Sequence, residues 1–146
     1  MKKRALLLVE DNADDEEMTI RALKGGNLAN EIVVARDGAE AVERLVGQGC
    51  TAETLPAVVL LDLHLPKVSG LEVLRRMRAD ERTRIIPVVV LTSSADDEDR
   101  VASYELGCNS FVRKPVGFAA FGEAVRQLGL YWLLLNEPPV GRRDGR

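Results

Sequence analysis

The chain has 146 residues, a length typical of one globular domain, and 29% of them are charged. Its net charge of −3, from 20 lysines and arginines against 23 acidic residues, argues against a general nucleic-acid-binding surface. No apolar run approaches the roughly 20 residues of a membrane span, and the run after the basic start is too short for a signal peptide, so we expect a cytoplasmic protein without nucleic-acid or membrane partners.

The first half of the chain alternates apolar runs of strand length with apolar residues at helical spacing. Ala5–Val9 is the first predicted strand, and a helical spacing from Met18 follows it until Gly25 ends the helix. Glu31–Ala35 is the second predicted strand, and a second helix begins after Asp37. The pattern of strand and then helix therefore repeats.

The second half continues the same alternation. Ala57–Leu61 is the third predicted strand, and Ser69 is a plausible cap for the helix after it. Pro87–Leu91 is the fourth strand and Ser110–Arg113 the fifth. Between them, Asp96–Leu106 is the next helix, which Gly107 and Asn109 end. The complete pattern predicts an α/β fold with a doubly wound, flavodoxin-like parallel sheet of five strands in the order 2-1-3-4-5, flanked by five helices.

The residues after the fifth strand predict a last helix that is more apolar than one face can bury. Residues 118–128 carry a single apolar stripe, whereas the next six apolar residues point all round: Leu130, Tyr131, Trp132, Leu133, Leu134 and Leu135. Such a segment on a small domain is typical of a protein interface, and a homodimer is the simplest case. The alternative is that the segment folds back over its own domain. Residues 136–146 predict a flexible tail.

Acidic residues follow two of the predicted strands. Glu10 and Asp11 come directly after the first strand, and Asp62 comes after the third. Because carboxyl ends of parallel strands meet at one edge of an open sheet, we expect the three carboxylates to lie together. Their repulsion favours a bound cation, and all-oxygen ligands favour Mg²⁺ or Mn²⁺.

Cys50 and Cys108 have neither CxxC spacing nor clustered histidines, which indicates reduced thiols.

Two further strand ends carry groups that suit phosphoryl chemistry. Thr92 follows the fourth strand with a hydroxyl donor, and Lys114 follows the fifth with a fixed positive charge. Asp62 is the expected acceptor because it ends a central strand, while Glu10 and Asp11 are better placed to hold metal. Each signal is weak alone, since acidic residues are common at helix starts. Their combination at converging strand ends is specific.

The motifs LLLVEDN, VVLLDLHLPKVSG, PVVVLTSS and SFVRKP resemble the receiver domain of two-component response regulators. The resemblance runs from Lys3 to about Leu130. It implies that Asp62 accepts a phosphoryl group from the phosphohistidine of a sensor histidine kinase. It also implies that Glu10 and Asp11 bind Mg²⁺ directly or through water, and that the backbone carbonyl of His64 completes the site. The His64 side chain would then border the pocket and modulate the access of water.

The same resemblance implies a conformational switch. Phosphoryl on Asp62 would draw in the Thr92 hydroxyl, and the side chain of Phe111 would enter the space that this movement frees. Many receivers have tyrosine where this chain has Phe111, and the alternative is that Phe111 is an ordinary core aromatic. Pro115, after Lys114, would have a cis peptide bond. Glu10 replaces a more usual aspartate, and its longer carboxylate can still reach the metal or its waters.

A narrower resemblance concerns the partner. The opening segment, the long loop before the third strand and the apolar end followed by Asn-Glu-Pro-Pro are similar to regulators paired with phytochrome-type sensor histidine kinases, in which a C-terminal arm commonly forms the dimer. We expect a stand-alone receiver domain over residues 3–135, with an extended last helix or arm from about 130, and a tail over 136–146. It would be a phosphoacceptor that assists its own phosphorylation and dephosphorylation, and no enzyme in the ordinary sense.

Two other functions fit parts of the pattern. A haloacid-dehalogenase-like phosphatase would also use an aspartyl nucleophile on a similar sheet, but it usually has an Asp general acid where this chain has His64. A pure interaction module would have lost some of the acidic pocket, whereas here the set is intact. Turnover of an aryl phosphate would indicate the phosphatase, and stoichiometric labelling the receiver.

Overall fold

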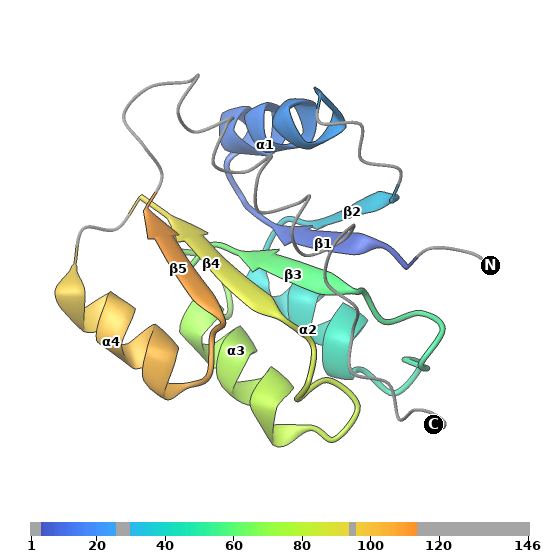
Figure 1. Ribbon diagram of the computed structural model, residues 1–146. Helices are drawn as coiled ribbons and strands as arrows, with labels where there is room; N and C mark the ends of the chain where they lie inside the picture. The colour runs from blue at the N-terminus through green and yellow to red at the C-terminus, as the bar shows by residue number, and fades with distance from the viewer. Residues whose placement is uncertain (1–3, 26–29, 94–95, 114–146) are drawn as a thin grey trace.

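A computed structural model describes residues 4–25, 30–93 and 96–113 (Figure 1). Within these residues a single parallel sheet of five strands has the order β2-β1-β3-β4-β5, as predicted. The strands are β1 (Leu6–Val9), β2 (Ile32–Ala35), β3 (Val58–Leu61), β4 (Val88–Thr92) and β5 (Ser110–Arg113). The described helices are α1 (Ala13–Gly25), α2 (Gly38–Val46), α3 (Gly70–Ala79) and α4 (Asp97–Glu105). The predicted fifth helix lies outside the described residues.

Alternate residues of the buried strands face the two layers of helices. On β1, Leu7 and Val9 belong to an apolar cluster with residues of α2 and α3, while Leu6 and Leu8 belong to a second cluster with residues of α1. Figure 1 shows α1 on one face of the sheet and α2 and α3 on the other. Because both faces are covered, the strands are continuous apolar runs, which is typical of parallel sheets.

The strand boundaries differ slightly from the predicted ones. Each of the first four strands begins one residue later than its apolar run, and β4 extends to Thr92 instead of ending before it. Hydrogen bonding between strands sets these limits, as at the start of β4, where Pro87 has no N–H to donate. The lengthened β4 makes Thr92 part of the sheet itself.

Polar side chains cap the helices that lead away from the sheet. Asp37 accepts a hydrogen bond from the Glu40 N–H at 2.7 Å at the start of α2, and Ser69 accepts one from the Glu72 N–H at 3.2 Å at the start of α3. The predicted Ser69 cap is therefore confirmed. These caps satisfy N–H groups that a helix start otherwise leaves without partners, and they fix where each helix begins.

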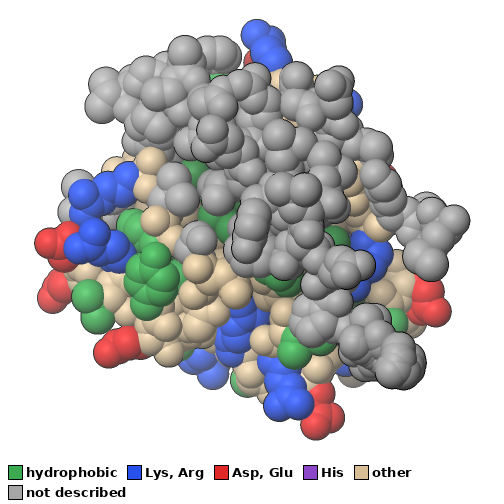
Figure 2. Space-filling model, in the orientation of Figure 1, with side chains coloured by type: hydrophobic (Ala, Val, Ile, Leu, Met, Phe, Trp, Pro, Cys, Tyr) green, Lys and Arg blue, Asp and Glu red, His purple; other side chains and the backbone are tan. Residues whose placement is uncertain are grey.

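The surface of the described part is polar, with a few exposed apolar side chains. Figure 2 shows hydrophobic side chains at the surface around α4, among acidic and basic ones, where Val101 and Tyr104 are about half exposed. No helix within the described ranges has the length and apolar character needed to cross a membrane. Cys50 and Cys108 are free thiols, as predicted.

Candidate functional site

Three carboxylates converge where β1 and β3 end. Glu10 and Asp11 follow β1, and Asp62 follows β3, its neighbour in the sheet. The Asp62 N–H donates to the carbonyl of Val9 at 3.1 Å and the Glu10 N–H donates to that of Ala35 at 3.0 Å, so the ladder continues past both strands. One carboxylate oxygen from each acidic residue lies within 4.8 Å of the others. The structure thus brings together the three residues that the sequence placed at this edge.

The burial of this cluster makes its charge costly without a counterion. Glu10 is 2% exposed and Asp62 is 8% exposed, whereas Asp11 faces solvent. Carboxylates this close repel one another, and water screens the buried pair poorly. The donors are all oxygens, and Asp11 is the exposed one of the three residues. The residues present therefore fit a hard divalent cation that retains some of its waters, such as Mg²⁺ or Mn²⁺.

Local backbone hydrogen bonds orient two of the carboxylates. The N–H of Asn12 donates to Glu10 Oε2 at 3.2 Å, while Asn12 Oδ1 accepts from the Asp15 N–H at 2.9 Å at the start of α1. The N–H of His64 donates to Asp62 Oδ1 at 3.3 Å. The turn into α1 and the loop after β3 thereby fix the directions in which these carboxylates point.

The loop after Asp62 closes back on the site through a glycine that the sequence reasoning missed. The N–H of Gly70 donates to the carbonyl of Leu63 at 2.9 Å, and a Cβ at Gly70 would overlap the backbone of Asp62 and Leu63. Only glycine allows this close approach of backbone to backbone. The only sequence signal for this contact was that a glycine follows the Ser69 cap directly. That signal is weak, because glycine also occurs at helix starts for other reasons.

A second missed contact ties the same loop to the start of α2. The Gly38 N–H donates to the carbonyl of Pro66 at 3.2 Å, and a Cβ at Gly38 would overlap the carbonyl of Val68. Lys67 has a φ of 72° and its Nζ lies 3.5 Å from Asp37 Oδ2. The pKa of Asp37 is lowered, mainly because its carboxylate accepts the Glu40 N–H, and Lys67 adds to the effect. The loop is thus held at both ends.

The remaining predicted site residues lie at the same edge or outside the described residues. Thr92 ends β4, which pairs with β3, and is fully buried. Phe111 lies on β5 opposite Val90 and is partly buried against the apolar cluster on the α2 and α3 face, a position that fits both the switch and the core reading. The described residues do not include Lys114, the predicted cis bond of Pro115 or the predicted interface residues 130–135.

His64 extends toward α4. Its Nε2 lies 3.5 Å from Asp99 Oδ2, and its side chain is 65% exposed. Among the described residues, the group that could hold a metal contains the three carboxylates and not this imidazole. The side chain therefore lies at the rim of the site, while the backbone of His64 contacts Asp62.

Two regulatory proteins are similar in sequence over nearly the whole chain. "Probable methanogenesis regulatory protein FilR2" of Methanothrix harundinacea is 40% identical over 134 residues, covering 92% of this chain and 86% of its own. Response regulator Rcp1 of Synechocystis is 36% identical over 131 residues, 89% of each chain.

Solved structures extend the comparison to forms with metal and phosphate. The Mn²⁺-bound form of Rcp1 has a TM-score of 0.85 at 35% identity, and the phosphorylated cyanobacterial phytochrome response regulator RcpA has a TM-score of 0.85 at 32% identity. Each comparison covers 94% of this chain and 99% of the other. The bacteriophytochrome response regulator AtBRR is 52% identical with a TM-score of 0.69, covering 94% of this chain and all of the other.

A family model agrees with these similarities. The model for the response regulator receiver domain matches residues 6–126, a range that includes every strand of the sheet and all three carboxylates. A phosphatase of the haloacid-dehalogenase type is therefore not supported. The chain belongs to the response regulator receiver domain family.

Proposed function

We propose that this receiver domain accepts a phosphoryl group on Asp62 from the phosphohistidine of a sensor histidine kinase. The observation that carries the proposal is the position of Asp62, buried at the end of β3 with its carboxylate within 4.8 Å of those of Glu10 and Asp11. In the transfer, a carboxylate oxygen of Asp62 attacks phosphorus and the bond from phosphorus to the imidazole nitrogen breaks. The electron pair of that bond stays on the imidazole of the kinase.

The metal set would be the carboxylates of Glu10, Asp11 and Asp62, with the backbone carbonyl of His64 completing it. A Mg²⁺ or Mn²⁺ ion bound there supplies positive charge next to the phosphoryl oxygens. Support comes from the all-oxygen, crowded donor set and from the Mn²⁺ in the similar Rcp1. The His64 N–H, which donates to Asp62 Oδ1 at 3.3 Å, holds the carboxylate in place for the attack.

Three other residues would respond to the phosphoryl group. The Thr92 hydroxyl, at the end of β4, would donate to a phosphoryl oxygen, and the ammonium group of Lys114 would pair with another. Phe111 would move toward the space that Thr92 leaves, with Pro115 in a cis peptide bond after Lys114. These contacts exist only with phosphoryl present, so they can shift an equilibrium between two conformations. The domain would thus assist its own phosphorylation and dephosphorylation while serving as a signalling module.

The similar phytochrome response regulators suggest the kind of kinase. RcpA and AtBRR are, by their names, phytochrome and bacteriophytochrome regulators, and AtBRR is 52% identical to this chain. We therefore propose a phytochrome-type sensor histidine kinase as the partner, with light sensing residing in that kinase. The transfer would occur in the cytoplasm, without a nucleic-acid or membrane partner for this domain.

The proposed assembly is a homodimer. The domain would span residues 3–135, with residues 136–146 as a flexible tail, and the apolar segment 130–135 would form the interface. Sedimentation velocity at micromolar concentration tests the assembly. We expect a dimer, and a monomer there would contradict this part of the proposal.

The acceptor is tested by incubation with Mg²⁺ and acetyl phosphate, followed by intact-mass measurement. The wild-type chain should gain one phosphoryl group, and Asp62→Asn should gain none because an amide is not a nucleophile for this transfer. Asp14→Asn, a change at an exposed residue of α1, is the matched control and should be labelled normally. Labelling of Asp62→Asn at the wild-type yield would overturn the assignment.

A further inference from the structure

The loop between Asp62 and α3 contains a turn that is strained at its central residue. The Val68 N–H donates to the carbonyl of Pro66 at 2.9 Å, which closes a three-residue γ-turn around Lys67. Lys67 has a φ of 72°, and no other non-glycine residue of the described part has a positive φ. A γ-turn with positive φ is the rarer and more strained form. Such a conformation persists only where the surrounding contacts impose it.

Contacts from the start of α2 hold this turn in place. The carbonyl of Pro66, which closes the turn, also accepts the Gly38 N–H at 3.2 Å. The backbone of Val68 lies so close to Gly38 that a Cβ there would overlap its carbonyl oxygen. The Nζ atom of Lys67 lies 3.5 Å from Asp37 Oδ2, so an ion pair spans the same junction. The other carboxylate oxygen of Asp37 caps α2, which fixes the direction of the carboxylate.

The same loop carries groups that the proposed function assigns to the metal and to the acceptor. The carbonyl of Leu63 accepts the N–H groups of Leu65 and Gly70, at 3.2 and 2.9 Å. The first of these bonds closes a γ-turn around His64, whose own N–H donates to Asp62 Oδ1 at 3.3 Å. A shift of the loop would therefore move the His64 carbonyl and the hydrogen bond that orients Asp62.

We propose that Lys67 is a positioning residue for the metal site, and that its ion pair with Asp37 holds the strained turn in the form that binds the cation. The inference rests on the proposed function and extends it to two residues outside the carboxylate cluster. Only two residues separate His64 from Lys67, so a change in the turn reaches the His64 carbonyl. Glycine would take this φ without strain, and lysine supplies the charge that glycine lacks.

The alternative is that the ion pair only stabilises the start of α2. The side chain of Lys67 is 69% exposed and that of Asp37 is 22% exposed, and ion pairs this accessible contribute little to folding. The positive φ of Lys67 also opposes folding, so stability alone would favour glycine at this position. The two interpretations therefore differ in what they predict for metal binding.

The test measures metal affinity directly, without phosphoryl transfer. The full chain is titrated with Mn²⁺, and the electron paramagnetic resonance of the free ion gives Kd. Lys67→Met removes the cation of the pair, and Asp37→Asn removes the anion but keeps an oxygen that caps α2. Each change should raise Kd about threefold, within the range of exposed ion pairs. The double variant should raise Kd no further, because either change alone breaks the pair.

The direction of the two effects separates positioning from long-range electrostatics. Loss of the positive charge of Lys67 would by itself favour a bound cation, whereas loss of the negative charge of Asp37 would disfavour it. Positioning predicts weaker binding in both variants. An unchanged or lower Kd in Lys67→Met would overturn the proposal.

Two further variants at the same position separate positioning from stability. Lys67→Arg keeps a positive charge beside Asp37 and should keep the wild-type Kd. Lys67→Gly relieves the backbone strain but loses the pair, so it should raise Kd about threefold without lowering the urea midpoint of the metal-free protein. A midpoint that falls in both Lys67→Gly and Lys67→Met, with Kd unchanged, would assign Lys67 to the fold alone.

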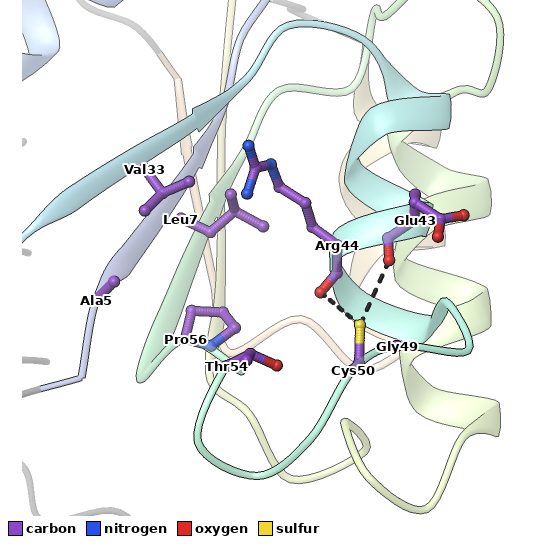
Figure 3. Close-up of a pocket in the computed structure, with 9 residues that line it drawn as sticks. All are labelled: Ala5, Leu7, Val33, Glu43, Arg44, Gly49, Cys50, Thr54 and Pro56. Carbon is purple, nitrogen blue, oxygen red and sulfur yellow. Dashed lines mark hydrogen bonds between the residues drawn. The ribbon is translucent and has the colours of Figure 1, made fainter.

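The matched control is Arg44→Met, which removes an exposed cation near the other end of α2. Arg44 Nε lies 3.3 Å from Glu40 Oε2, an exposed pair like the one at the turn. Figure 3 shows its side chain reaching toward Leu7 and Val33, where it lines a groove of about 310 Å³. The carboxylates follow the opposite ends of the strands that carry Leu7 and Val33 or lie beside them. Arg44→Met should leave Kd unchanged, and a threefold rise there would overturn the assignment to Lys67.

The outcomes also separate this inference from the proposed function. Labelling of wild-type Asp62 by acetyl phosphate tests the acceptor, whereas the ratio of Mn²⁺ Kd values tests the role of Lys67. If Asp62 is labelled and the variants bind Mn²⁺ as the wild type does, the inference alone is wrong. If the variants bind Mn²⁺ more weakly and Asp62 is not labelled, the positioning role stands and the acceptor is wrong. A wild type that binds no Mn²⁺ would overturn the metal set and this inference together.

Discussion

Asp11 is the exposed member of the carboxylate cluster, so its charge can be removed with little effect on packing. Glu10 and Asp62 are buried beside it, and without a cation the three charges repel one another. The repulsion among the three carboxylates destabilises the folded protein when no metal is bound. A bound cation relieves that repulsion, so the same repulsion favours metal binding.

The first prediction follows from that balance. Asp11→Asn should raise the unfolding free energy of the metal-free protein by about 0.5 kcal/mol, by removing one repelling charge. It should also abolish most of the stabilisation by Mg²⁺, which for the wild type is about 2.7 kcal/mol at a Mg²⁺ concentration one hundred times Kd. Thermal unfolding with and without Mg²⁺ measures both effects. Asp14→Asn should keep the Mg²⁺ response, and an unchanged response in Asp11→Asn would remove Asp11 from the metal set.

Gly70 shows how a residue without a side chain positions the acceptor. A methyl group there would meet the backbone of Asp62 and Leu63, so the loop after β3 would have to shift. We predict that Gly70→Ala lowers the unfolding free energy by about 1–3 kcal/mol, the usual cost of overpacking, and slows labelling by acetyl phosphate. Gly49→Ala is the control, since a Cβ at Gly49 meets open space. Equal stability of the two variants in urea would contradict this account.

At the scale of elements, Arg78 joins α3 to the two segments that lead into β4 and β5. Its guanidinium group donates to the carbonyl of Ile86 at 2.9 Å, to that of Gly107 at 3.0 Å and to Asn109 Oδ1 at 3.2 Å. Asn109 Oδ1 also accepts the Val88 N–H at 2.8 Å. Burial lowers the pKa of Arg78, yet the charge is retained because so many acceptors surround it.

We predict that Arg78→Met destabilises the domain by about 2–3 kcal/mol, since several carbonyl groups lose a charged donor. Arg78→Lys should restore little of this, because an ammonium group cannot reach the same spread of acceptors. The control is Arg76→Met on the same helix, where the exposed pair with Glu72 contributes at most about 1 kcal/mol. Urea unfolding compares the three variants, and similar losses at 76 and 78 would show that Arg78 has no special role.

The end of α4 illustrates how glycine stops a helix at the edge of the sheet where β5 begins. Gly107 has a φ of 97°, its N–H donates to the carbonyl of Tyr104 at 3.0 Å, and the Cys108 N–H donates to that of Ser103 at 3.0 Å. This pair of bonds is a Schellman motif, which satisfies carbonyls that the helix leaves open. The predicted stop at Gly107 was right because the reason is local.

At the scale of the whole molecule, the proposed switch connects the acceptor with the surface around α4. Thr92 lies between them, at the end of β4 and before the residues that lead into α4. The side chain of His64 adds a contact between the loop after β3 and α4, with its Nε2 3.5 Å from Asp99 Oδ2. In the proposed switch, a signal from Asp62 would have a short path to α4, where Val101 and Tyr104 are exposed.

We predict that Thr92→Ala still takes up phosphoryl from acetyl phosphate but does not pass on the change. Hydrogen exchange in α4 and β5 should respond to phosphorylation in the wild type and much less in Thr92→Ala. Thr92→Ser, which keeps the hydroxyl, is the control and should behave as the wild type. A full response in Thr92→Ala would exclude the hydroxyl as the switching group.

The sequence by itself determined the alternation of strands and helices and the three carboxylates, because these follow from periodicity and from where each apolar run ends. The expected sheet order came from the common doubly wound arrangement that such an alternation adopts. Ser69 and Gly107 were also readable, since caps and helix stops are local. Only the tertiary structure decided the closure of the loop after Asp62 and the network around Arg78. Those contacts join residues far apart in the chain, such as Gly38 with Pro66, and no short pattern records them. Hydrogen bonds between strands likewise set the strand starts and placed Thr92 within β4.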